Sequence, residues 1–336
     1  MTQKHLILTC MKNEGPYILE WVAYHMSIGF DHFLVYINDC EDGTDKILRR
    51  LANMGIVTLR HNPAREGARA SHQVRAYRKS TKEQIYKDHD WVAVIDADEF
   101  VNIHAGSGNI RDLTAAAPDA KCISLAWRLF GSADVTAFHD GFLTETLRRA
   151  APEHCPEPTQ AWGFKSIHRT DAVDIVGCHR PKSVPNDDWA ALNWAGPAGT
   201  PMPESYFKNS WRMNRKTISY DLGQINHYAV RTRESFLLKS ARGRAFGEGI
   251  RGADYWEDMN RNETYDVSIQ PKLGAMKDIY EDLVCDPKLG RLHDRAVQWH
   301  RDQILAVMET DTGRALMEAI TPSLDLFPGL RKRVAA

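Results

Sequence analysis

The stretch DWVAVIDADEF, Asp90–Phe100, decides the fold class because an apolar run ends abruptly in three carboxylates. Such a run is typical of a buried strand. Residues two apart on a strand share a face, so Asp96 and Asp98 are expected to point the same way, with Glu99 on the opposite face. Ligand sites of α/β sheets lie outside the carboxyl ends of the strands. The stretch therefore predicts a strand that presents an acidic pair to a ligand.

The flanking sequence alternates short apolar runs with helical patterns, which is typical of a parallel sheet wound with helices. Strands are expected at residues 5–10, 32–39, 56–61, 91–100 and 121–127, and helices at 15–29, 42–55, 66–87 and 110–116. Beyond Arg148 the pattern changes. Two stretches rich in Pro and Gly, 151–163 and 193–205, are expected to be loops over a site. One or two strands within 164–183, a helix at 231–245 and helices over the last 60 residues complete the prediction.

Composition excludes several classes of function. The chain has 43 Lys and Arg against 44 Asp and Glu, so no overall field favours nucleic acid. Its six cysteines form no CxxC pair, which argues against a zinc knuckle and for a reducing compartment. The first apolar run is too short for a signal peptide, and no window approaches about 20 apolar residues. We expect a cytoplasmic protein whose basic end, RKRVAA at 331–336, allows peripheral contact with the inner face of a membrane.

The acidic pair favours a divalent cation. Two hard oxygen donors with open positions suit Mg²⁺ or Mn²⁺ that carries a diphosphate, rather than a closed zinc site. A solvated loop is the simplest alternative. A phosphatase of the haloacid dehalogenase type would carry its acidic pair after the first strand, and a nucleotidyltransferase would show a loop rich in Gly and Arg where this chain has CMKNEGPY, residues 10–17. Both of these enzyme classes are disfavoured.

Three stretches in order resemble the nucleotide-sugar glycosyltransferases of the GT-A fold, in the bacterial family-2-type and family-92-like group. They are KNEGPYILEWVAYHMSIGFDHFLVYINDCEDGT at 12–44, WVAVIDADEF at 91–100 and INHYAVRTRESFLLKSARGRA at 225–245. The resemblance implies a Rossmann-like, mostly parallel central sheet flanked by helices, a loop-rich acceptor region and C-terminal helices. It divides the chain into a nucleotide-sugar-binding half (1–130), an acceptor-binding and metal-completing half (131–250) and a C-terminal helical extension (251–336).

The resemblance also implies which residues hold the nucleoside. These are Asn13 and Glu14 after the first strand and Asp39 after the second. A carboxylate can accept a hydrogen bond from a uracil imide N–H or a ribose hydroxyl. The alternative for Asp42–Thr44, within the same motif, is an ordinary turn and helix cap, and both roles can hold together.

By the same resemblance Asp98 binds Mn²⁺ or Mg²⁺ directly, Asp96 lies near the ribose or the metal, and His227 completes the metal shell. A structural role for a histidine in a strand is the alternative. Three basic residues of the expected helix could neutralise the departing diphosphate, or form a solvated face: Lys239, Arg242 and Arg244.

The implied reaction moves a sugar from a nucleoside diphosphate sugar, with UDP favoured, to a hydroxyl of a glycan or glycolipid, with inversion. Inversion needs a general base opposite the leaving group. Asp187 and Asp188 lie roughly where family-2 enzymes place it, but the QxxRW-type motif of that family is absent; Glu145 and His179 are competitors. The alternatives are a degenerate transferase that holds a nucleotide without turnover and a metal-dependent phosphotransferase acting on a glycan.

Overall fold

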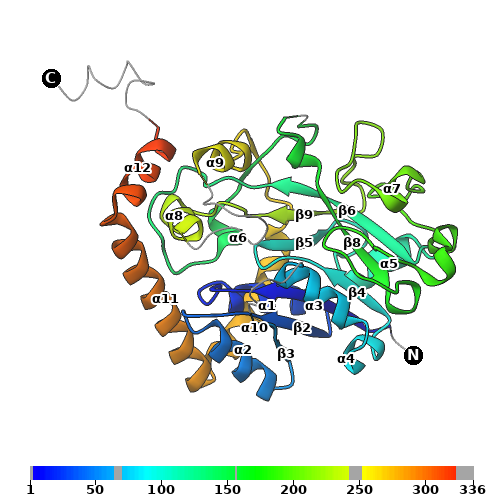
Figure 1. Ribbon diagram of the computed structural model, residues 1–336, viewed down its shortest axis with the longest axis horizontal. Coiled ribbons are helices and arrows are strands. Elements are labelled where there is room, and N and C mark those ends of the chain that lie inside the picture. Colours follow the sequence, from blue (N-terminus) through cyan, green and yellow to red (C-terminus); the bar gives the residue numbers. More distant parts are fainter. Residues whose placement is uncertain (1–2, 64–69, 156, 242–251, 323–336) are drawn as a thin grey trace.

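A central sheet with helices on both faces forms the body of the protein (Figure 1). The computed structural model describes residues 3–63, 70–155, 157–241 and 252–322. The eight strands, in spatial order, are β3 (Val57–His61), β2 (His32–Ile37), β1 (His5–Met11), β4 (Trp91–Val94), β8 (Phe164–Arg169), β6 (Cys122–Leu129), β9 (Gly223–His227) and β5 (Glu99–Ile103). A small second sheet pairs β7 (Arg149–Ala150) with β10 (Thr264–Tyr265).

The sheet is parallel in its first half and mixed in its second. Strands β1–β4 all run the same way. Strand β8 is antiparallel to both β4 and β6, β9 is parallel to β6, and β5 is antiparallel to β9. The predicted α/β architecture is confirmed. Strands β8 and β9 come from residues 131–250 and complete the sheet begun by residues 1–130, so the proposed halves share one sheet and their boundary remains a prediction.

Alternate residues of the central strands pack into two separate cores, which explains the two helical layers. Ile7, Phe33 and Ala93 face one core, and Leu8 and Leu34 face the other. The first core is covered by α1 (Ile18–Ser27), α2 (Thr44–Asn53), α5 (Ile110–Ala116), α10 (Leu273–Val284) and α11 (Pro287–Met308). The second lies under α3 (His72–Ser80), α4 (Gln84–Lys87) and the irregular segments after β8.

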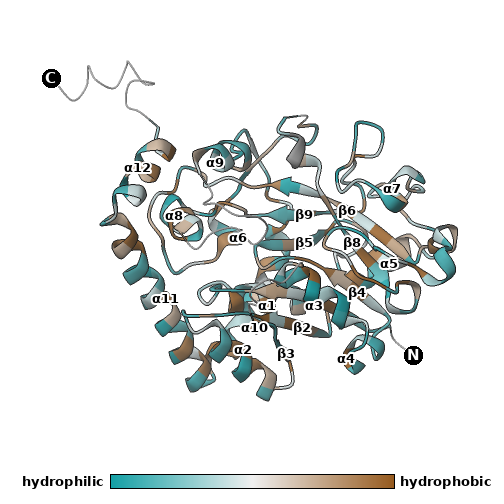
Figure 2. Cartoon of the chain, in the orientation of Figure 1, coloured by the Kyte–Doolittle hydropathy of each residue, from teal (hydrophilic) through white to brown (hydrophobic). Residues whose placement is uncertain are grey.

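The remaining helices are short, apart from α12. They are α6 (Leu143–Thr146), α7 (Ser205–Lys208), α8 (Arg233–Ala241), α9 (Ala253–Met259) and α12 (Asp311–Ile320). Figure 2 shows hydrophilic and hydrophobic residues on different sides of α2 and α11, as expected for helices that lie on a core. The predicted C-terminal helices are present. The basic stretch 331–336 lies outside the described residues.

Two elements differ from the prediction. The helix expected at 66–87 is two helices, α3 and α4, because Ser71 caps α3 with a hydrogen bond from the Val74 N–H at 3.3 Å and a turn follows Ser80. Its first residues, 66–69, lie outside the described part of the chain. The strand expected at 91–100 ends at Val94.

A tight turn follows Val94 and leads into β5, which the sequence did not predict. The Glu99 N–H donates to the Asp96 carbonyl at 3.1 Å, and the Asp96 N–H donates to Glu99 Oε2 at 2.8 Å. The expectation that Asp96 and Asp98 share a strand face is therefore wrong, since both residues lie in the turn.

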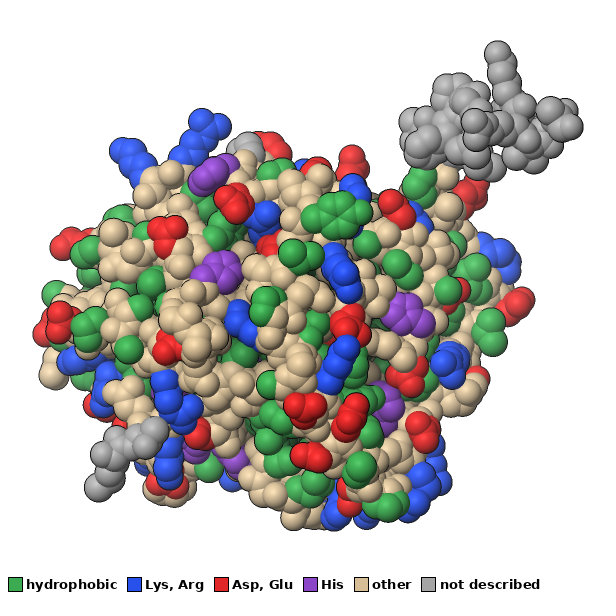
Figure 3. Space-filling model, turned by 180° about the vertical axis from the view of Figure 1, so that it is seen from behind, with side chains coloured by type: hydrophobic (Ala, Val, Ile, Leu, Met, Phe, Trp, Pro, Cys, Tyr) green, Lys and Arg blue, Asp and Glu red, His purple; other side chains and the backbone are tan. Residues whose placement is uncertain are grey.

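The surface carries no dominant charge on the face shown in Figure 3, where acidic and basic side chains are mixed. The six cysteines are free thiols. No helix in the described ranges has both the length and the apolar character needed to cross a bilayer.

Candidate active site

The candidate site lies where β1, β2 and β4 end on the same edge of the sheet. The register pairs Leu8 with Val94 and Met11 with Ile37, so the loops that follow these three strands meet. Strand β9 ends at this edge too, because its last residue, His227, pairs with Glu99, the first residue of the neighbouring strand β5. Four strand ends therefore supply the site, as expected for an α/β sheet.

Asp98 is held between a lysine and a histidine. The Lys239 ammonium on α8 donates to Asp98 Oδ2 at 2.5 Å and to the Ala229 carbonyl at 2.8 Å. His227 Nε2 lies 3.7 Å from Asp98 Oδ1. Burial opposes ionisation of Asp98, but the positive charges of Lys239 and Arg231 outweigh it and keep its pKa below the usual range. The site therefore holds a carboxylate already matched by an ammonium.

His227 is a neutral imidazole at pH 7, because burial lowers its pKa to about 4 despite the nearby Asp98 carboxylate. A metal ligand needs this neutral form. His227 Nε2 and Asp98 Oδ1 face each other, and a carboxylate oxygen with an imidazole nitrogen suits Mn²⁺ or Mg²⁺ that takes its other ligands from phosphate and water. Across the described ranges no group of three or more His, Cys, Asp or Glu residues is arranged to hold a metal. The pair therefore fits an ion that the substrate helps to bind.

Asp96 and Glu99 share a buried lysine from β8. Lys165 is fully buried, and its ammonium lies 2.7 Å from Asp96 Oδ2 and 3.2 Å from Glu99 Oε2. Burial disfavours the charged lysine, but Asp96, Cys178 and Glu99 raise its pKa well above the ordinary value. Gln73 on α3 donates to the other oxygen of Asp96 at 2.7 Å. These contacts fix the turn that carries Asp98.

Glu99 is the weakest acid of the cluster. Burial raises its pKa to about 8, and the Asp96 and Asp98 carboxylates add to the rise while Lys165 opposes it. Lys165 is therefore the charged partner of Asp96, and Glu99 takes up a proton most readily.

Glu14 has a partner within the chain. Arg231 donates to Glu14 Oε2 at 2.7 Å, and its guanidinium lies 3.7 Å from the centre of the Tyr17 ring. Arg231 is 2% exposed and has a left-handed φ of 59°. The Glu14 carboxylate holds Arg231 at the site, and its predicted contact with the nucleoside stays a prediction.

Asn13 and Asp39 lie in the two loops predicted to hold the nucleoside. Both have left-handed backbones, with φ of 55° and 46°. Asn13 Oδ1 accepts the Glu41 N–H at 2.9 Å, and Asp39 is exposed at the end of β2. Asp42 joins the loops, because its carboxylate accepts the Gly15 N–H at 2.7 Å and the Thr44 N–H at 2.8 Å. The turn and cap role expected of this segment is present.

The other predicted catalytic acids lie elsewhere. Asp188 accepts the Ala191 N–H at 3.2 Å, and the short helix Trp189–Leu192 that it caps bonds to Lys121 just before β6. Because β6 is parallel to β4, this is the edge of the sheet opposite to Asp96. The number of residues between Asp96 and Asp188 did not reveal that Asp188 lies at the opposite edge of the sheet. The base assignment to Asp188 and its neighbour is therefore not supported.

Asp187 forms an ion pair with Lys208 at 3.4 Å on an exposed loop of that distant edge. Glu145 pairs with Lys277 of α10 at 2.5 Å, on the α10 side of the molecule. Neither contact links these acids to Asp98. Arg242, predicted to bind the diphosphate, and Arg244 lie outside the described residues.

His179 does lie beside the cluster. Its Nδ1 is 2.9 Å from the Phe164 carbonyl, which can only accept, so Nδ1 carries the proton and Nε2 is left as an acceptor. Its ring packs against Trp127 and Trp211, with centroids at 5.4 and 5.0 Å. Burial and the Lys165 charge lower its pKa to about 3. This neutral imidazole is the candidate base that the structure brings near Asp96.

Two functional cations escaped sequence reasoning, Lys165 and Arg231. The residue pattern of β8 does not show that Lys165 is buried, nor that it pairs with Asp96, which lies 69 residues earlier. The sequence pattern indicates Arg231 only as the first residue of an expected helix. Its contact with Glu14 spans 217 residues of sequence.

Comparison with known proteins places the chain in a family. The sequence model of glycosyltransferase family 92 matches residues 5–234. The chain belongs to glycosyltransferase family 92. This confirms the predicted resemblance in its family-92 part, whereas the bacterial family-2-type part is not confirmed.

Curated family 92 relatives are plant proteins. One from Oryza sativa subsp. japonica is 27% identical over 300 residues, covering 85% of this chain and 45% of its own length. One from Ricinus communis is 31% identical over 110 residues, covering 32% of this chain and 18% of its own. The chain thus spans less than half the length of these relatives. Among solved structures, S. aureus TarS 1–349 is 10% identical with a TM-score of 0.34, covering 95% of this chain and 89% of that one.

The raised pKa of Glu99 predicts a pH-dependent stability. Because the folded state holds the Glu99 proton more tightly than the unfolded chain, this carboxyl favours folding at low pH and loses that contribution as pH rises from about 4.5 through about 8. We expect the free energy of unfolding of the wild type, relative to Glu99→Gln, to fall over that window and then level off. Urea denaturation from pH 5 to 9 measures this; a constant difference contradicts it.

Proposed function

We propose that this family 92 protein transfers a sugar from a nucleoside diphosphate sugar to an acceptor hydroxyl of a glycan or glycolipid. The observation that carries the proposal is the placement of Asp98 between Lys239 and His227. A cavity of about 190 Å³ adjoins this group, lined in part by Asn13, Arg231 and Lys239. Acidic, basic and polar groups thus converge where strands end, as a bound nucleoside diphosphate requires.

Asp98 and His227 would hold Mn²⁺ or Mg²⁺. The ion, when bound, supplies Lewis-acid neutralisation of the diphosphate charge. Lys239 is positioned to share this task, since its ammonium touches Asp98 and lines the cavity. Arg231 adds a second fixed positive charge on the same wall. Preorganised cations of this kind stabilise charge that develops on a leaving group. A uridine nucleotide is the donor that the sequence resemblance favours.

The transfer breaks the bond between the anomeric carbon and the diphosphate oxygen and forms one from that carbon to the acceptor oxygen. The acceptor hydroxyl loses a proton, and the nucleoside diphosphate leaves with the electron pair. Inversion requires that a base take the proton on the face opposite to the diphosphate. We assign this role to His179, whose Nε2 is an acceptor and whose ring is held beside the buried Trp127.

Replacing the central carboxylate tests the donor site. We expect wild-type protein to bind UDP more tightly than GDP in isothermal titration, and more tightly with Mn²⁺ than with EDTA. Asp98→Asn should lose the metal-dependent gain, at least tenfold, because an amide is a poor ligand for a hard cation. Asp88→Asn, an exposed acid bonded only to Gln84 among the described residues, is the matched control.

Two results would count against the proposal. Full metal-dependent affinity in Asp98→Asn would remove Asp98 from the metal site. Failure of the wild type to bind either nucleotide would overturn the nucleotide-sugar assignment itself. Thermal denaturation of each variant checks that the fold persists.

The base assignment is tested separately by His179→Gln. An amide can replace the hydrogen bond to Phe164 but cannot accept a proton from the acceptor. We expect the rate of sugar transfer to fall by about 10²–10⁴-fold, the usual contribution of a general base, while UDP affinity stays unchanged. Donor consumption and calorimetry measure the two quantities. A variant that keeps the wild-type rate excludes His179 as the base.

A further inference from the structure

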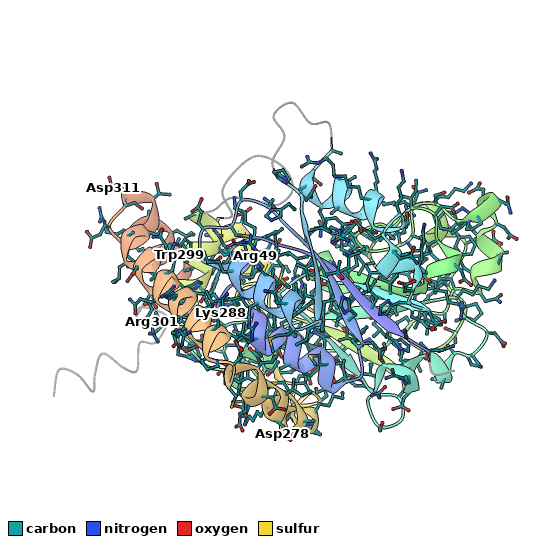
Figure 4. The ribbon with its side chains drawn as sticks, turned by 90° about the horizontal axis from the view of Figure 1, so that it is seen from below. Arg49, Asp278, Lys288, Trp299, Arg301 and Asp311 are labelled. Atoms are coloured by element: carbon teal, nitrogen blue, oxygen red, sulfur yellow. The ribbon has the colours of Figure 1, made fainter. Side chains whose placement is uncertain are left out.

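The cavity beside Asp98 has a second wall that comes from the C-terminal helix α11. There Trp299, Gln303 and Val307 line the same space as Asn13, Arg231 and Lys239. Residues four apart on a helix lie on one face, so the three form a single stripe. Figure 4 labels Trp299 on the side of α11 that faces the body of the molecule. The helix lies outside residues 5–234, which match the family.

The position of α11 is fixed by direct contacts with the loops of the site. Asp286 caps the helix through the Leu289 N–H at 2.8 Å and forms an ion pair with Arg50 of α2 at 2.5 Å. A side-chain carbon added at Gly15 would lie 2.6 Å from Ala296 Cβ, so α11 rests directly on the loop that follows β1. The stripe is therefore part of the site wall rather than a mobile surface.

A buried contact between His300 of α11 and Tyr17 also joins the helix to the site. His300 is 5% exposed, and its ring lies edge-on to that of Tyr17 with centroids 5.7 Å apart. Tyr17 in turn stacks under the Arg231 guanidinium. Arg231 Nε is buried without a hydrogen-bond partner among the described residues. A buried donor of this kind costs free energy unless a ligand meets it.

The lining chemistry matches a nucleoside. An indole face stacks on any nucleobase, and a glutamine amide can both donate to and accept from a base edge. The cavity, about 190 Å³, is smaller than the roughly 300 Å³ at which pockets for whole small molecules begin, so it fits part of a nucleotide. The end of the cavity at Lys239 is the one nearest Asp98, and its positive charge suits the diphosphate. The base then lies toward α11.

We infer that α11 is the base-binding wall of the donor site: Trp299 stacks on the nucleobase, and Gln303 reads its polar edge. This inference rests on the proposed function, because it assigns one part of the same donor. It adds specificity residues from a segment beyond the matched family region. Discrimination between bases then depends on Gln303, and affinity for any base depends on Trp299.

The test is calorimetric titration of the full chain with UDP, GDP and inorganic pyrophosphate, all in Mn²⁺. Pyrophosphate carries the diphosphate group of the donor without a base. We expect Trp299→Ala to weaken UDP binding about tenfold or more, with pyrophosphate binding unchanged and Trp299→Phe close to wild type. Gln303→Ala should reduce the ratio of UDP to GDP affinity. Leu305→Ala, an exposed aliphatic position 67% accessible on the same helix, is the matched control.

The outcomes separate the two claims. Unchanged UDP affinity in Trp299→Ala, with nucleotide binding by the wild type intact, overturns the α11 assignment and leaves the proposed function standing. Equal loss of UDP and pyrophosphate binding also overturns it, since the helix would then support the diphosphate and not the base. Absence of nucleotide binding in the wild type defeats both.

Discussion

The structure depends on pairing carboxylates that are largely withdrawn from water. Glu14, Asp98 and Glu99 gather with the partly exposed Asp96 where the parallel strands end, and an uncompensated buried charge costs several kcal/mol. Three buried cations from later in the chain form ion pairs with these acids: Lys165 on β8, Arg231 after β9, and Lys239 on α8. The acidic loops therefore take their charge partners from the second half of the sheet and the segments that follow it.

This constraint links the fold to the proposed chemistry. A diphosphate with its divalent ion brings both signs of charge into a site whose own charges are already paired. Lys239 touches Asp98 and lines the donor cavity, so the same ammonium can serve the carboxylate and the phosphate. Arg231 is held in place by Glu14 and Tyr17, and the rigidity of that arrangement is what electrostatic preorganisation requires.

Much of the fold could be predicted from the sequence. The parallel strands and the helices between them follow from apolar periodicity, and the acidic stretch lies at the edge of the sheet that holds the candidate site. The turn at Asp96 and strand β5 could not be predicted, because a backbone hydrogen bond to the Glu99 carboxylate closes the turn and no apolar pattern encodes it.

The site was predictable only where its residues are local in sequence. A rule about strand ends finds Asp96 and Asp98, and the resemblance of two short motifs points to Asn13 and Asp39. Lys165 and Arg231 are brought in by pairing over 69 and 217 residues, which a single sequence does not reveal. Asp188 shows the reverse error, since a suitable sequence distance placed it at the site, whereas the short helix that it caps bonds to Lys121 at the start of β6, on the opposite edge.

The most direct test of the central claim is a crystal structure of the full chain with UDP and Mn²⁺. The account predicts nucleotide density in the cavity between α8 and α11, with the diphosphate against Lys239 and with Arg231 still paired to Glu14. Nucleotide bound at another surface, with the pairing of Lys239 and Asp98 undisturbed and the cavity empty, would contradict it.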